Sequence, residues 1–392
     1  MEPENPTPVP QNPVSGQETK THAPRQAEFL LPPDPDGHGV TWVFMGPQGL
    51  RAGWSIVIFL AIFSVLAMGL NSAAHYVMLH FFHSKAGTGQ MTANGTILSE
   101  GLAVLSLWIA ARLMALIERR SVWDYNLNGP NRVRYFAQGL VAGFVALSVL
   151  VGSMAAGGWL HLGATTLNTA EMVKYAIAWA IAFLLVGCME EGLARCYLLF
   201  TLGRGLNFWW GLGLVAFMCG LFSLNHKANG LWGAYSIALL GLIPCLILQM
   251  RNAPSTGFWC AAWVTSVFFG GGHTGNGGEN WIGIFAAAAI GFVFCVSVYV
   301  TKCAWWAIGC HAAWDWGETY FYGTADSGMK ATGNLLTATP MGNVLWSGGT
   351  DGPEGSLLVL AVILLLLIAV VAIYRRRTNK LEPVRAAEQV AG

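Results

Sequence analysis

The chain contains about ten apolar stretches, each close to the length that a helix needs to cross a lipid bilayer. A hydrocarbon core of about 30 Å requires roughly 20 apolar residues in helical form. Inside lipid a backbone must satisfy its own hydrogen bonds, so such stretches predict helices. They cover residues 53–78, 96–117, 135–160, 173–200, 208–225, 231–250, 257–272, 281–300, 304–320 and 356–374. The sequence therefore predicts an all-α, polytopic membrane helix bundle.

Composition agrees with this prediction and excludes other classes. Charged residues make up 10% of the chain, against roughly 25% in soluble globular domains. The formal net charge is +1, so no basic surface for nucleic acid is expected. All eight cysteines lie within or beside the apolar stretches without a CxxC pair. We expect them to pack as small apolar side chains rather than form disulfides or bind metal.

The distribution of basic residues predicts the orientation in the membrane. If the amino terminus faces the cytoplasm, that side receives thirteen basic residues and the opposite side receives four. The positive-inside rule then places both termini in the cytoplasm. The thirteen are Arg51, Arg119, Arg120, Arg132, Arg134, Arg204, Arg251, Lys302, Arg375, Arg376, Arg377, Lys380 and Arg385, and the four are Lys85, Lys174, Lys227 and Lys330.

The chain divides into five segments by composition. Residues 1–50 hold most of the sixteen prolines and no apolar periodicity, which predicts a disordered cytoplasmic tail. Residues 51–170 are expected to form amino-terminal transmembrane helices, and residues 171–320 a transmembrane core. Residues 321–355, rich in Gly and Thr, are expected to form an outer loop over whatever the helices enclose. Residues 356–392 complete the chain with a last helix and a basic cytoplasmic tail.

Few acidic residues fall inside the predicted spans, and ionisable groups at membrane depth usually face a protein interior or a wet cavity. These are Glu100, Glu190, Glu191, Asp315 and Glu318. In the stretch EEGLAR, Glu191 and Arg195 are four residues apart and can pair on one helix face. Glu190 is rotated by about 100° and can point elsewhere. The alternative is a structural ion pair beside one protonated glutamate between helices.

Histidines supply the second set of candidates. In HAAWDWGE, His311 and Asp315 share a helix face, so both can project into one cavity, with Asp315 orienting the imidazole or binding water. The alternative is a hydrogen bond that only packs helices. Phe269 and His273 repeat the four-residue spacing near the end of another apolar helix, where an interfacial role is the alternative.

The estimated depths of three side chains agree. Glu190, His273 and His311 lie about 21, 25 and 13 Å from the cytoplasmic ends of their helices, at 1.5 Å per residue. They can therefore meet in one intramembrane pocket. A carboxylate beside two imidazoles can act as a general base on water, or the trio can bind Zn²⁺ with an open position for water. Either arrangement would hydrolyse a bond within the membrane, and the sequence does not decide between them.

Three motifs in this order resemble those of the CPBP family, which contains the CAAX prenyl endopeptidases and bacteriocin-processing proteins. Its pattern EExxxR, FxxxH and HxxxN or HxxxD is matched by Glu190-Glu191-x-x-x-Arg195, Phe269-x-x-x-His273 and His311-x-x-x-Asp315. The resemblance covers about residues 170–320. The stretches HTGNGGENWIGIF and CAWWAIGCHAAWDW are similar to bacterial members, which implies a bacterial plasma membrane.

The resemblance implies a glutamate-dependent intramembrane endopeptidase acting on a membrane-associated peptide or protein in the lipid bilayer. By this resemblance, Glu190 would activate water, while His273, His311 and Asp315 would shape the water and oxyanion site. Glu191 and Arg195 would be supporting residues, and Phe269 completes the second motif. The chain departs from many members by reading EEGLARCY, without the bulky aromatic and Arg-Gly of the first motif.

Two alternatives remain open. Residues 208–230 and 258–277 form an imperfect repeat in which Phe222 and His226 copy the FxxxH spacing, so His226 is an alternative second-motif histidine. For function, the rivals are a transporter or proton relay that uses the same intramembrane Glu and His groups, and a non-catalytic immunity or scaffold member of the fold.

Overall fold

The computed structural model describes residues 41–46, 49–80, 90–225 and 232–391. Most of the predicted amino-terminal tail lies outside these ranges. Within the tail, α1 (Thr41–Phe44) is followed by β1 (Met45–Gly46), which pairs with β2 (Gly49–Leu50) in antiparallel register.

The predicted polytopic helical fold is confirmed. Among the described residues, six helical segments are long and apolar enough to cross a membrane, and two shorter apolar helices accompany them. The six are Ala52–His80 (α2), Ala93–Ile117 (α3), Arg132–Ala156 (α4), Thr169–Gly203 (α5, Thr169–Glu191, with its continuation), Trp232–Met250 (α8 and α9) and Trp281–Thr301 (α11). The shorter ones are α7 (Phe208–Asn225) and the start of α14 (Leu358–Ala391); α10 (Thr256–Gly272) and α12 (Trp305–Trp316) complete the bundle.

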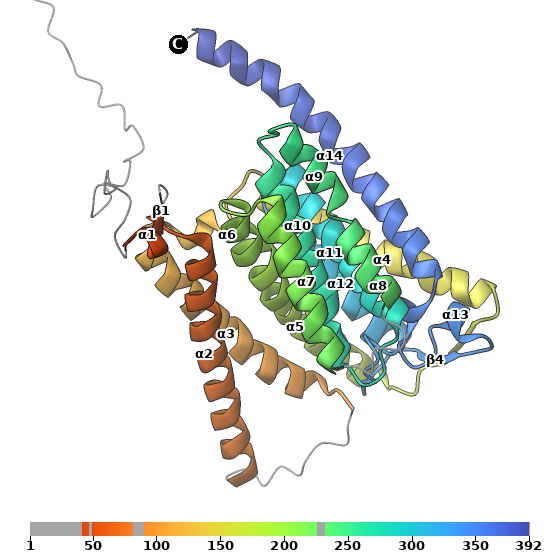
Figure 1. Cartoon of the computed structure of the whole chain (residues 1–392). Coiled ribbons are helices and arrows are strands. Elements are labelled where there is room, and N and C mark those ends of the chain that lie inside the picture. The colour runs from red at the N-terminus through yellow and green to blue at the C-terminus, as the bar shows by residue number, and fades with distance from the viewer. Residues whose placement is uncertain (1–40, 47–48, 81–89, 226–231, 392) are drawn as a thin grey trace, which may run out of the picture.

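Helix α12 lies at the centre and packs against α4, α5 and α11. Helix α10 packs between α11 and α7, while α2 and α3 lie on the side of α5 and α14 covers α11 and α4 (Figure 1). All eight cysteines are free, and all except the half-buried Cys188 are buried, in agreement with the predicted packing role. The central position of α12 brings its polar residues into contact with several neighbouring helices.

Three glycines allow α4 and α12 to approach closely. A Cβ atom added to Gly139 or Gly143 would collide with the carbonyl oxygen of Trp306 or Cys310. One added to Gly309 would collide with the carbonyl oxygen of Phe136. Small residues at helix interfaces let backbones come together in this way within membranes. These glycines therefore set the distance between the central helix and α4.

The two ends of the bundle are tied by different contacts. At one end Arg204 pairs with Glu118 at 3.2 Å, and the Trp305 indole donates to the carbonyl of Leu127. At the other end β3 (Leu160–Gly163) pairs antiparallel with β4 (Thr337–Pro340), and the Trp179 indole donates to the carbonyl of Thr332. The start of α2 and the carboxyl end of α14 lie on the same side of the bundle (Figure 1). That this side is cytoplasmic stays a prediction.

Three of the expected spans are not single α-helices. The span 231–250 breaks into α8 (Trp232–Leu240) and α9 (Ile243–Met250) because Pro244 has no N–H and clashes with the preceding turn. The Trp263 indole packs at Gly241 and donates to the freed carbonyl of Ala238 at 2.7 Å. The expected span 173–200 contains a π-helical segment, Gly192–Leu198, which leads into α6 (Leu199–Gly203). The expected span 304–320 ends in a second π-helical segment, Gly317–Tyr322.

The segment 321–355 is ordered and attached to the bundle. It contains β4, α13 (Val344–Ser347) and a 3₁₀ turn at Pro353–Gly355. The carboxylate of Asp351 accepts a hydrogen bond from the backbone N–H of Asn280 at 3.0 Å, and the Asn280 amide donates to the carbonyl of Gly355 at 3.2 Å. These contacts hold the segment against the start of α11.

Candidate active site

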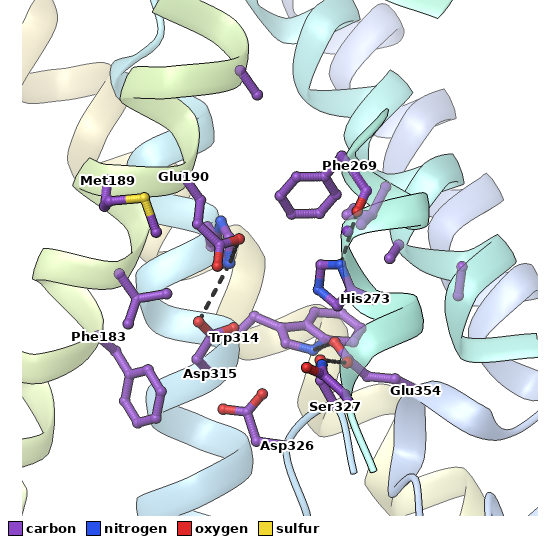
Figure 2. A pocket seen from close by; sticks show the side chains of 18 of the residues that line it. Phe183, Met189, Glu190, Phe269, His273, Trp314, Asp315, Asp326, Ser327 and Glu354 are labelled. Carbon is purple, nitrogen blue, oxygen red and sulfur yellow. Dashed lines mark hydrogen bonds and ion pairs between the residues drawn. The ribbon is translucent and has the colours of Figure 1, made fainter. Parts of the chain in front are cut away.

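A cavity of about 360 Å³ lies between α3, α5, α10, α11, α12 and the segment 321–355. Of the predicted site residues, Glu190, His273, His311, Asp315 and Phe269 line it, whereas Glu191 and Arg195 lie outside its lining. Figure 2 shows Glu190 on one wall and His273 on the opposite wall, with Asp315 on the Glu190 side. Residues from three separate motifs thus face one space.

Glu191 and Arg195 form a fully buried ion pair behind the cavity. Arg195 Nη1 lies 3.0 Å from Glu191 Oε1, and both side chains have 0% exposure. The guanidinium stacks over the Phe269 ring at 4.2 Å from its centroid. Arg195 Nε and Nη2 have no hydrogen-bond partner, so Glu191 and the aromatic ring supply most of the compensation for this charge. The pairing expected from the four-residue spacing is present.

His311 is held by Glu191 as well as by Asp315. Its Nδ1 lies 2.9 Å from Glu191 Oε1, and its Nε2 lies 3.4 Å from Asp315 Oδ2. An ionised carboxylate only accepts hydrogen bonds, so Nδ1 carries a proton. The spacing in sequence allowed Asp315 either to orient the imidazole or to bind water, and the shorter contact to the ring comes from Glu191 on a different helix. The ring is therefore fixed with Nε2 toward the cavity.

Glu190 differs from its neighbour in sequence because it points into the cavity. Its side chain is 28% exposed, and its Oε2 lies 3.7 Å from His311 Nε2. Figure 2 shows the carboxylate directed toward the open space. Rotation by about 100° between adjacent helical residues separates the buried Glu191 from the accessible Glu190. The carboxylate of Glu190 is thus available to a water molecule or a substrate.

His273 directly follows the last residue of α10 and faces the cavity from the side opposite Glu190. Its Nδ1 lies 2.9 Å from the carbonyl oxygen of Phe269. A carbonyl only accepts, so Nδ1 donates and Nε2 of the neutral ring remains an acceptor. The Phe269 ring packs against the His273 and His311 rings, with centroids 5.0 and 5.9 Å away. Phe269 therefore positions both imidazoles, whereas the alternative His226 lies outside the described residues.

The predicted trio does not have the geometry of a zinc site. Tetrahedral zinc with ligands at about 2.1 Å brings the ligand atoms to about 3.4 Å from one another. Within the described ranges, the three-residue group whose ligand atoms approach within 4.8 Å consists of Glu318, Asp326 and Glu354. Glu190, His273 and His311 form no such group. Zinc at the trio would require the cavity walls to move inward.

Sequence reasoning did not assign several acidic residues that line the cavity. Glu100 comes from α3, and Asp326 and Glu354 come from the segment 321–355. Burial and the carboxylate of Glu354 raise the pKa of Asp326 to about 7. The intramembrane position of Glu100 was a usable signal, but the loop residues have no periodicity that could have pointed to them. Among the described residues, no Lys or Arg lines this cavity.

Comparison with known proteins gives one match. Searches of curated proteins and of solved structures find none. The matched residues, 245–317, include His273, His311 and Asp315, and they begin 55 residues after Glu190. Over residues 245–317 the chain matches the Type II CAAX prenyl endopeptidase Rce1-like family, which confirms the resemblance found in the sequence.

Proposed function

We propose that the protein is an intramembrane endopeptidase in which Glu190 activates the water that attacks a peptide bond. The family match supports a CAAX-protease-like intramembrane endopeptidase at the family level. The observation that carries the finer proposal is the position of Glu190, which reaches the cavity 3.7 Å from His311 Nε2 while Glu191 is locked to Arg195. The substrate is a membrane-associated peptide or protein.

In the proposed reaction Glu190 takes a proton from water as the oxygen attacks the carbonyl carbon. The His273 ring faces the same space, and its Nε2, when it carries no proton, can accept a hydrogen bond from the attacking water and orient it. The carbonyl oxygen becomes an oxyanion in the tetrahedral intermediate. Glu190 then returns the proton to the leaving nitrogen as the C–N bond breaks, so that a carboxylate and an amine are released.

His311 is the proposed donor to the oxyanion. Glu191 holds the imidazole through Nδ1, so the ring can present Nε2–H toward the cavity when both nitrogens are protonated. Asp315, at 3.4 Å from Nε2, balances that charge. A fixed donor costs no reorganisation during the reaction, and removing such a donor lowers kcat by about 10²–10³.

The test is peptide cleavage by the purified full-length protein in detergent, followed by mass spectrometry of a peptide library. Glu190→Gln and His311→Ala are expected to abolish cleavage. His161→Ala is the matched control, because His161 is an exposed residue of β3 outside the cavity. Cleavage that survives both cavity substitutions would refute the proposal.

A proton relay is favoured by one observation, namely that the carboxylates of Glu190, Asp315, Asp326 and Glu354 line a single cavity. Uptake of protons into proteoliposomes separates the two functions. A peptidase predicts no flux in the wild-type protein, whereas proton flux in the wild-type protein that is reduced in Glu190→Gln favours the relay.

A further inference from the structure

Three buried carboxylates form a compact group beside the catalytic cavity. Glu318 comes from the π-helical end of α12, and Asp326 and Glu354 come from the two ends of the segment 321–355. Each can offer an oxygen, and these oxygens all lie within 4.8 Å of one another. Glu318 and Asp326 are eight residues apart, and Glu354 is brought to them by the fold of the segment 321–355.

The group contains a polar atom that has no partner. Glu318 is 0% exposed, yet its Oε1 forms no hydrogen bond. Its Oε2 accepts a hydrogen bond from the Trp314 indole at 3.0 Å, and the same indole donates to Glu354 Oε1 at 2.9 Å. A buried carboxylate oxygen without a partner is costly and requires an explanation.

No basic side chain among the described residues pairs with this buried carboxylate group. None of the ion pairs found among the described residues involves Glu318, Asp326 or Glu354. Their other contacts are neutral donors, the Ser327 hydroxyl to Glu354 at 2.8 Å and the Thr319 hydroxyl to Asp326 at 3.0 Å. The three clustered carboxylates therefore form no ion pair with a basic side chain of the described residues.

We propose that Glu318, Asp326 and Glu354 bind a calcium ion that fastens the segment 321–355 to α12. The ligands are all oxygens, which hard cations prefer over zinc or copper. Calcium binds oxygens at about 2.3–2.6 Å, so its ligand atoms can lie up to about 5 Å apart, whereas magnesium draws them closer. A spacing within 4.8 Å is compatible with one calcium ion shared by the three carboxylates.

The cavity gives the ion a route and further ligands. Asp326 and Glu354 both line the catalytic cavity, so ions and water reach the site from there. Water and second carboxylate oxygens can complete the six to eight ligands that calcium takes. The bound ion would hold Asp326 and Glu354 in the cavity wall, and the inference does not depend on peptidase activity.

The test measures calcium binding directly. Full-length protein in detergent is freed of metal with a chelator and titrated with CaCl₂ in a calorimeter. We expect one calcium per chain in the wild type, with affinity weakened about tenfold or more in Glu318→Gln and in Asp326→Asn, since charge count tunes affinity. Glu279→Gln is the matched control, a half-buried carboxylate next to the group that is not one of the three.

Two results would overturn the inference. One is the lack of any binding up to about 10 mM CaCl₂, well above the range of weak extracellular sites. The other is equal affinity in the wild type, Glu318→Gln and Asp326→Asn. Where Glu318→Gln fails to fold, Asp326→Asn decides alone, because Asp326 lies in the segment and not in a helix. Protection of residues 321–355 from proteolysis by CaCl₂ gives a second readout.

Discussion

The buried ion pair between Glu191 and Arg195 makes a quantitative prediction. At a separation of 3.0 Å and an effective dielectric constant near 20, the attraction between the two charges is about 5.5 kcal/mol. Arg195 also loses its stacking on Phe269 when it is replaced, which is worth about 2 kcal/mol in a desolvated site. Breaking one side of such a pair typically costs about 3–5 kcal/mol.

We therefore expect Arg195→Met and Glu191→Gln each to lower the free energy of unfolding by about 3–5 kcal/mol. The double variant removes both charges, so no charge is left unpaired. It should recover to within about 2 kcal/mol of the wild type, with the remaining deficit coming from the lost stacking on Phe269. The coupling between the two sites should thus be large compared with the roughly 0.5 kcal/mol scatter of independent sites.

The assay is equilibrium unfolding in mixed micelles by titration with SDS, followed by tryptophan fluorescence and circular dichroism. Helical content before the titration checks that each variant folds. If the double variant is destabilised by the sum of the two single effects, the pair does not act as a unit and the reasoning fails. Glu191→Gln keeps an oxygen that accepts from His311 Nδ1, so its stability effect reports mainly on the charge.

Two further predictions concern packing and pH. Gly139→Ala should destabilise the bundle by about 1–3 kcal/mol because its methyl group would collide with the Trp306 carbonyl. Gly152→Ala, on the same helix with open space around it, should instead be neutral or stabilising by up to about 1 kcal/mol; equal effects in the SDS titration would contradict the packing account. Burial and the carboxylates of Glu354 and Asp351 raise the pKa of Glu279 to about 9, and burial raises the pKa of Asp351 to about 7. Both groups bind protons more tightly in the folded protein than in the unfolded one. Their contribution to the free energy of unfolding is therefore complete below about pH 4 and is lost as the pH rises through 7 to 9. The SDS concentration at the midpoint of unfolding should decrease as the pH is raised from 5 to 9, and Glu279→Gln should make that decrease smaller. A midpoint that increases with pH would contradict this account.

Local spacing predicted the contacts that occur within one helix. Glu191 pairs with Arg195, and His311 approaches Asp315, each across one turn. Such pairs follow from a period of 3.6 residues and need no knowledge of neighbouring helices. The same argument could not find the 2.9 Å contact between Glu191 and His311, which are 120 residues apart. It also could not place Glu190 and His273 on facing walls.

The apolar stretches by themselves determined that this chain folds as a helical membrane bundle, because lipid leaves the backbone few other ways to satisfy its hydrogen bonds. Only the tertiary structure decided which charged groups meet. The close approach of α4 and α12 depends on which residues face each other across the two helices. Asp326 and Glu354 reach the cavity through a segment without periodicity, so their position follows from how that segment packs on the bundle and from no pattern in the residues.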